Sequence, residues 1–297
     1  YPEEMLDIND IANKLNEEGK HFVVIHLTGA HEMYLCGEPY DSMFDPEYEG
    51  EIPDYETYLE YVDIYGSEKL DAMGIFFELA NGLKIEEIVK MDYNETSEEH
   101  LSDLRRRKVK DHEHVIALYD GKIRRTDDTV GKIFSLLKAG DAWDNTVLVV
   151  FSDHGEGFFE HGYYDHGLGL YDDLIHVVFF MKIPGMQPRE INRLVGLIDV
   201  APTVFDVLGI DANLTKQDGL SALKVMGDRE SNRDIFSQLG TSLVSVRTEE
   251  GYLYIYCIHA ETGELYKLPD DHNNIISQEP EKGAELERKI LEYLGYY

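Results

Sequence analysis

Residues 146–157, Thr-Val-Leu-Val-Val-Phe-Ser-Asp-His-Gly-Glu-Gly, constrain the fold more than any other stretch of this chain. The first six are apolar or β-branched and do not alternate with polar residues. This pattern is typical of a strand buried on both faces, in the centre of an α/β sheet. Ligands of open α/β sheets bind beyond the carboxyl ends of the strands. Asp153 and His154, directly after this strand, are therefore candidates for half of a metal site.

More potential ligands follow this strand closely. They are histidines and acids that a cation site or an anion site could use: Glu156, Glu160, His161, Asp165, His166 and His176. The formal net charge of the chain is -32. An anionic substrate would therefore need local positive charge, which a bound cation and histidines can supply.

The same charge excludes some partners. Nucleic-acid binding needs clustered Lys and Arg to release counterions, and anionic membranes attract basic segments; neither partner is expected here. No apolar run approaches the length of a membrane span.

Two cysteines, Cys36 and Cys257, give no disulfide framework, and we expect both to be free thiols. With 297 residues the chain can hold one large domain and a small appendage.

Periodicity predicts a succession of helices and short strands, the repeat of a doubly wound α/β domain. From residue 233 the sequence pattern changes to an alternation of apolar and polar residues, which is typical of antiparallel strands. His112 and His114 are expected on a solvated helix face, because side chains two apart diverge on a helix. His176 is likewise given no functional role. The predicted elements are helices at 7–18, 115–137, 199–208 and 280–294, and strands at 21–27, 146–151, 173–181, 242–247, 252–258 and 264–268.

Several motifs follow one another in a recognisable order. The first, at residues 22–34, is a predicted strand that runs into a loop with His31. The second, at residues 119–131, contains Tyr-Asp-Gly-Lys-Ile and a later Asp-Asp. The third, at residues 152–171, contains Ser-Asp-His-Gly-Glu, Glu-His-Gly, His-Gly and Leu-Tyr. Asp-Val-Ala-Pro-Thr at 199–203 and Glu-Leu-Tyr-Lys-Leu at 264–268 complete the order. Over nearly its whole length the chain resembles the sulfatase family of the alkaline-phosphatase-like superfamily.

The resemblance implies an α/β fold: a partial alkaline-phosphatase-like α/β/α sandwich with a small C-terminal antiparallel sheet and a terminal helix. It divides the chain into a sulfatase-like domain at 1–232 and a subdomain at 233–297. It also implies roles for four residues. Asp153 and His154 would be ligands of one divalent cation, Ca²⁺, Mn²⁺ or Zn²⁺, of which Ca²⁺ suits the imidazole least. His31 and His166 would contact the anionic ester oxygens or protonate the leaving group. His161 would orient a ligand or the loop.

Two features of the family are missing. Its first strand ends in acidic metal ligands and is followed by a nucleophile, in sulfatases a modified cysteine in Cys-x-Pro-Ser-Arg. Cys36 is followed by Gly-Glu-Pro, and Cys257 lies in the predicted C-terminal sheet. The loop at His31 also lacks both prolines of the family pattern, with Ala30 and Met33 in their place. We therefore expect the chain to be the C-terminal two thirds of a sulfatase-like protein, starting after the nucleophile.

Three functional readings follow. The first is a metal-dependent hydrolase of small-molecule sulfate monoesters, present as a portion with little or no activity alone. The second is a phosphate or phosphonate ester hydrolase, or a phosphotransferase, of the same superfamily, since the Asp-His pair is typical of phosphotransferase-like relatives. The third is a non-catalytic chain that binds a metal or a partner. Because a sheet without its central strand exposes apolar edges, a partner chain or a second copy of this chain is expected to complete it.

Overall fold

A computed structural model describes residues 10–11, 14, 17–27, 34–54, 56–57, 59–60, 79, 106, 108–140, 142–211, 218–227, 233–269 and 272–296. The chain forms two compact units. The first is Tyr1–Asn145 with Gly162–Asp165, and the second is Thr146–His161 with His166–Tyr297.

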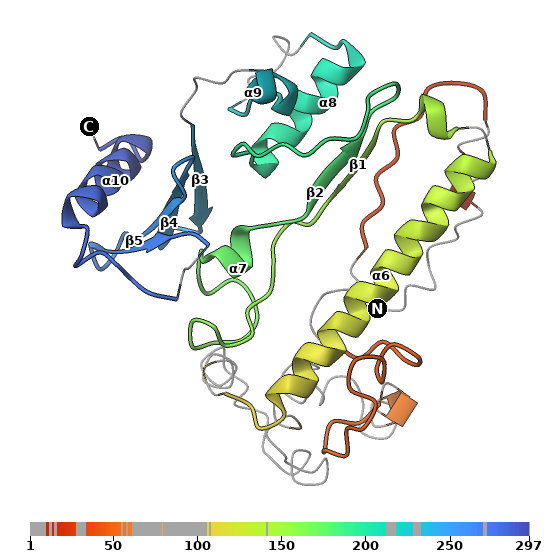
Figure 1. The fold of residues 1–297 in the computed structure, drawn as a ribbon, viewed down its shortest axis with the longest axis horizontal. Coiled ribbons are helices and arrows are strands. Elements are labelled where there is room, and N and C mark those ends of the chain that lie inside the picture. The colour runs from red at the N-terminus through yellow and green to blue at the C-terminus, as the bar shows by residue number, and fades with distance from the viewer. Residues whose placement is uncertain are drawn as a thin grey trace. The chain divides into compact units, whose positions relative to one another are not determined.

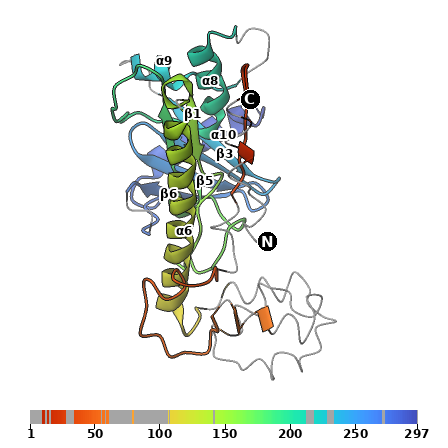
Figure 2. The same ribbon diagram turned by 90° about the vertical axis from the view of Figure 1, so that its right-hand side faces the viewer.

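The main element of the first unit is helix α6, His112–Ala139, an uninterrupted rod in Figures 1 and 2. The helix predicted at 115–137 is thereby confirmed. Val115, Leu118, Ile133 and Leu137 are buried along one face, as the helical period requires. The helix ends at Gly140, whose amide donates to the carbonyl of Leu136 at 3.0 Å. A short 3₁₀ turn, η3 (Trp143–Asn145), follows.

A loop of irregular structure, residues 34–54, packs against α6. The contact explains a glycine inside the helix: a Cβ at Gly121 would lie 2.3 Å from the carbonyl oxygen of Tyr40. The loop turns around Asp41, whose carboxylate accepts from the amides of Cys36 and Gly37 at 2.7 and 3.0 Å. Arg125 donates from α6 to the Cys36 carbonyl at 2.9 Å. Cys36 and Cys257 are free thiols, as predicted.

The strand predicted at 21–27 does not form. Within the described residues this segment pairs with no other strand, and Phe22 and Val24 are 85% and 76% exposed. A β-strand forms only where a neighbouring strand exchanges hydrogen bonds with it, and an apolar composition alone does not provide that neighbour. The helix predicted at 7–18 lies largely outside the described residues.

The second unit begins with β1, Leu148–Phe151, and β2, Phe179–Lys182, which pair antiparallel from Leu148↔Lys182 to Phe151↔Phe179. The predicted strand at 146–151 is confirmed in position. The prediction that this strand is buried on both faces is wrong within the described residues, where Phe151 is 49% exposed. The reason is that β2 is the only strand that pairs with it among those residues. The strand predicted at 173–181 begins too early: Asp172–Ile175 form a helical turn, α7.

Helix α8, Val200–Leu208, follows the 3₁₀ turn η4, Leu197–Asp199, and lies beside α9, Ala222–Gly227 (Figure 1). The helix predicted at 199–208 is confirmed. It stops at Gly209, which takes φ 66°, a left-handed conformation that glycine adopts without a steric penalty.

The C-terminal sheet contains four antiparallel strands in sequence order: β3 (Asp234–Leu239), β4 (Leu243–Thr248), β5 (Tyr252–Cys257) and β6 (Thr262–Lys267). The last three were predicted and β3 was not. The helix predicted at 280–294 is confirmed as α10, Pro280–Tyr293, which covers one face of the sheet (Figure 1). Their shared core is formed by Val244, Val246, Tyr254, Tyr256, Leu265, Leu286 and Ile290. None of the helices in the described part of the chain is long and apolar enough to cross a lipid bilayer.

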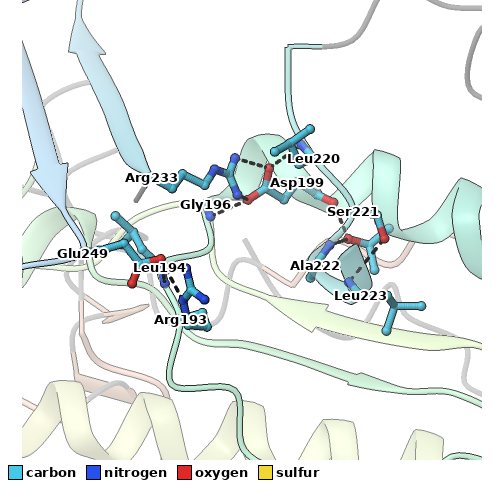
Figure 3. Close-up of polar contacts among 11 residues, drawn as sticks. Arg193, Leu194, Gly196, Asp199, Leu220, Ser221, Ala222, Leu223, Arg233 and Glu249 are labelled. Atoms are coloured by element: carbon cyan, nitrogen blue, oxygen red, sulfur yellow. Dashed lines mark hydrogen bonds and ion pairs between the residues drawn. The ribbon is translucent and has the colours of Figure 1, made fainter. Parts of the chain in front are cut away.

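A buried ion pair joins the α8 region to this sheet (Figure 3). Asp199, which is fully buried, accepts from both terminal nitrogens of Arg233 at 2.6 Å each. Its carboxylate also accepts the amides of Gly196 and Leu220, at 3.0 and 2.8 Å. Four hydrogen bonds therefore satisfy the two oxygens of this buried carboxylate. It fixes the chain just before β3 begins.

Candidate metal and anion site

The site lies where β1 ends. The amide and hydroxyl of Ser152 exchange hydrogen bonds with the backbone of Val178, at 3.1 and 3.2 Å, which closes the two-stranded ladder. The amide of Gly155 then donates to the carbonyl of Leu174 at 2.8 Å. A Cβ at Gly155 would lie 1.9 Å from the carbonyl oxygen of Asp173, so only glycine fits. Residues 153–155 form a turn, called the metal turn below, that is pressed against the backbone of α7.

The metal turn presents Asp153 and His154 together. Nδ1 of His154 lies 2.7 Å from the carbonyl oxygen of Gly155, and because a carbonyl can only accept, Nδ1 carries the proton. In the neutral ring the lone pair is then on Nε2, which lies 3.8 Å from Oδ2 of Asp153. Two ligands that are each about 2 Å from one cation are at most about 4 Å apart. The chemistry and the spacing of these two atoms fit a shared divalent cation.

A second pair adjoins the metal turn. Nδ1 of His166 lies 3.2 Å from Oε1 of Glu156, and the Glu156 side chain is only 3% exposed. The ring of His166 stacks on that of His154 at 4.0 Å between centroids. The side chains of Glu156 and His166 both carry atoms of the kind that bind metal ions. The structure thus brings three of the four predicted site residues, Asp153, His154 and His166, into one place.

Sequence reasoning placed Glu156 in the cluster but gave it no role. Its position two residues after His154 was the only signal, and burial of the carboxylate against His166 became visible only in three dimensions. His31, the fourth predicted site residue, lies outside the described residues.

His161 does not join the metal turn directly. Its ring stacks on Tyr171 at 3.7 Å between centroids, with the planes 2° apart, and Nε2 lies 4.0 Å from Asp173. The His176 side chain is 67% exposed beside Asp172, and its predicted lack of a functional role stays a prediction.

His112 and His114 were predicted on a solvated helix face, and this is wrong for His114. That residue is 7% exposed, stacks on Tyr48 at 3.4 Å and lies 3.0 Å from Asp45. His112 bonds to the hydroxyl of Tyr164 at 2.8 Å. The reason is that the loop at 34–54 covers this end of α6, which the sequence pattern of the helix alone does not reveal.

Cys36 has none of the properties of a reactive thiol. It is 8% exposed, and burial, with the nearby Asp41 carboxylate, raises its pKa to about 12. The thiolate is the nucleophilic form of cysteine, and it is disfavoured here.

Comparison with known proteins gives a consistent picture. The family described as Sulfatase matches residues 5–210. Arylsulfatase K of Canis lupus familiaris is 24% identical over 208 residues, which cover 63% of this chain and 38% of that protein. A Delta 4,5-hexuronate-2-O-sulfatase of Bacteroides thetaiotaomicron is 24% identical over 170 residues, 53% of this chain and 35% of the relative. The chain therefore spans little more than a third of the length of these relatives.

Among solved structures, the phosphonate monoester hydrolase of Silicibacter pomeroyi superposes with a TM-score of 0.55 at 17% identity. The match covers 87% of this chain and 52% of that one. The likeness shows that the fold is α/β of the predicted kind, with the small four-stranded antiparallel sheet and terminal helix described above.

Proposed function

This chain belongs to the sulfatase family, and from that premise we propose that it forms part of a metal-dependent hydrolase of small-molecule sulfate monoesters. Asp153 and His154 would hold one divalent cation, and His166 and His31 would contact the ester. The observation that carries the proposal is the metal turn, in which the proton on Nδ1 of His154 is held by a backbone carbonyl and Nε2 lies 3.8 Å from Asp153.

The cation would be Mn²⁺, Zn²⁺ or Ca²⁺. A ligand pair of one imidazole nitrogen and one carboxylate oxygen suits Mn²⁺ and Zn²⁺ better than Ca²⁺, which prefers oxygen. When bound, such an ion supplies positive charge for the oxygens of an anionic ester. The protein contributes the turn itself, whose backbone is held by the hydrogen bond from the Gly155 amide to the Leu174 carbonyl.

His166 would act on the ester itself. Glu156 holds the imidazole through Nδ1 at 3.2 Å, so Nε2 is the ring atom that we assign to the ester oxygens or the leaving group. A hydrogen bond from a charged donor stabilises the negative charge that develops on those oxygens. A carboxylate behind the imidazole orients the ring and stabilises its protonated form when it carries that charge.

We assign no nucleophile among the described residues that surround the metal turn. The 297 residues contain no Cys-x-Pro-Ser-Arg motif, and burial disfavours the thiolate of Cys36. We therefore propose that this chain alone hydrolyses sulfate esters slowly or not at all. The division into a domain at 1–232 and a subdomain at 233–297 is part of the same proposal.

A phosphate or phosphonate ester hydrolase is the second candidate. It is favoured by the Asp-His pair at 153–154, and it agrees with the fold similarity to a phosphonate monoester hydrolase. Sulfate and phosphate monoesters present similar anionic oxygens, so the metal turn by itself accommodates either.

We propose that a second copy of this chain or another chain completes the sheet. The argument for this partner comes from the strands beside the site. Within the described residues β1 and β2 pair only with each other, and Phe151, Val178 and Phe180 are 45–59% exposed. Two-stranded sheets are marginally stable in water without further cover. Light scattering from the purified chain should report a mass above that of one copy if a second copy provides this cover; a monomeric mass would rule out the second copy.

Calorimetry with Mn²⁺, Zn²⁺ and Ca²⁺ tests the metal assignment. The unchanged chain should bind Mn²⁺ or Zn²⁺, and Asp153→Asn should weaken that binding by about 100-fold. Asp144→Asn, which alters an exposed acid on η3, is the matched control and should bind as the unchanged chain does. Equal binding by Asp153→Asn, or no binding by the unchanged chain, would overturn the assignment. Parallel assays with 4-nitrophenyl sulfate, 4-nitrophenyl phosphate and a phenylphosphonate ester test the reaction class.

A further inference from the structure

We infer that the C-terminal sheet sets the position of the metal turn through α7, with Arg247 as the positioning residue that connects them. The inference deepens the proposed function and rests on it for the role of the turn. Every contact in the argument lies within the second unit.

The first link joins the metal turn to α7. The amide of Gly155 donates to Leu174 at 2.8 Å, and the contact with the Asp173 carbonyl leaves no space for a Cβ. A backbone contact this close allows little independent movement, because interiors are close-packed and transmit displacement. A shift of α7 would therefore shift Asp153 and His154.

Helix α7 does not hold its own position. It has four residues and its N-cap, Tyr171, makes no side-chain cap hydrogen bond. Isolated helices of this length are unstable, because nucleating one turn fixes several dihedral angles for one hydrogen bond. Tertiary contacts must therefore supply the stability that the sequence of α7 alone does not provide.

The second link supplies them from the C-terminal sheet. Arg247 on β4 forms an ion pair with Asp172, in the first turn of α7; the two side chains are 22% and 18% exposed. Arg247 pairs with Ile235 of β3 on one side and Leu253 of β5 on the other, so it projects from a central strand. A charge-assisted bond at this burial is stronger than one at the surface.

A second tether lies next to the first. The hydroxyl groups of Tyr171 and Tyr266 both donate to Oε2 of Glu264, at 3.0 and 2.6 Å. Burial, together with the Glu264 carboxylate, raises the pKa of both phenols well above the ordinary value, so both remain donors. Glu264 and Tyr266 belong to β6. Two strands of the sheet thus hold the first turn of α7.

His161 closes the arrangement from the loop after the metal turn. It stacks on Tyr171 and lies 4.0 Å from Asp173, and Tyr171 packs in turn on the buried cluster of Leu170, Leu253, Ile255 and Tyr266. The loop therefore returns to the element on which the turn already rests. This gives the Glu-His-Gly histidine a specific use, which is to secure α7 rather than to contact a ligand.

The test compares two ion pairs of the same sheet. Arg247→Met removes the tether to α7, and Lys289→Met removes the 2.7 Å pair between α10 and Asp234 of β3, which does not touch α7. Hydrogen exchange of the Gly155 amide should become faster in Arg247→Met and remain unchanged in Lys289→Met. Mn²⁺ affinity should fall by about tenfold in Arg247→Met only, and Arg247→Lys should recover part of it. Melting temperatures should be similar for the two methionine variants.

Unchanged Gly155 exchange in Arg247→Met would overturn the inference. If Arg247→Met does not fold, Tyr171→Phe removes the other tether with the loss of one hydroxyl and is expected to give the same local change in exchange. If the unchanged chain binds no Mn²⁺, the metal assignment fails, while the exchange measurement still decides whether the sheet positions the turn.

Discussion

Two histidine–carboxylate pairs in this protein are alike in geometry and opposite in burial. His114 lies 3.0 Å from Asp45 in the first unit, and His166 lies 3.2 Å from Glu156 in the second. In the first pair the His114 side chain is 8% exposed and its acid 36%. In the second the His166 side chain is 24% exposed and its acid only 3%.

The difference in burial indicates which of the two side chains in each pair is held in place by the other. Burial lowers the pKa of His114 although Asp45 acts to raise it, so the neutral ring packs under Tyr48 as part of the core. At His166 the carboxylate is the buried partner and the ring reaches the metal turn, stacked on His154. The second arrangement is the one that the proposed ligand role of His166 requires, because the exposed member of that pair is the imidazole, whereas in the first pair the imidazole is buried.

The largest effect should come from His114→Ala. Removing a buried, stacked ring should lower the free energy of unfolding by about 3 kcal/mol, because the cavity between α6 and Tyr48 cannot refill. Urea denaturation measures this loss, and calorimetry should show unchanged Mn²⁺ affinity. A variant that kept its stability but lost the metal would reverse the roles given to the two pairs.

His166→Gln should show the opposite response. The Kd for inorganic sulfate, measured by calorimetry with saturating Mn²⁺, should rise about tenfold, since hydrogen bonds to charged groups are the strong ones. Stability should change by less than about 0.5 kcal/mol. His176→Gln, at an exposed histidine on the same segment, serves as the control. Sulfate affinity that is equal in both variants contradicts the ligand role of His166.

A smaller effect should appear in the pH dependence of stability. The folded pKa of His114 is lowered by burial, so its contribution to stability is complete above the unfolded pKa of about 6.5 and is lost as pH falls through the folded pKa. The stability difference between the unchanged chain and His114→Gln should therefore narrow from pH 8 to pH 5. A difference that stays constant over this pH range would contradict the lowered pKa of His114.

Much of the fold was predictable where local pattern and tertiary environment agree. Helices α6, α8 and α10 have an apolar period; Gly140 and Gly209 mark where α6 and α8 end, and Pro280 marks where α10 begins. Strands β4, β5 and β6 alternate, and each is paired by a neighbour close in sequence. Short-range pairing depends little on the rest of the chain, which is why reading the sequence in order sufficed.

Prediction failed where a partner distant in sequence decides the outcome. Residues 21–27 have the composition of a strand and pair with none in the described chain. Residues 173–175 open the run that was predicted as a strand, and together with Asp172 they form α7 instead, where Arg247 and Glu264, more than seventy residues later, hold the turn. His114 was misplaced for the same reason, since Asp45 and Tyr48 reach it from a separate loop.

The sequence by itself determined the family, the strand that leads to the site, and the identity of Asp153, His154 and His166 as candidates, because motif order and the abrupt end of an apolar run are local properties. Only the tertiary structure decided that Nε2 of His154 lies beside the Asp153 carboxylate, that Glu156 is buried beneath His166, and that the C-terminal sheet holds α7 against Gly155. Those relations depend on burial and on contacts between residues far apart in the chain, which no local pattern encodes.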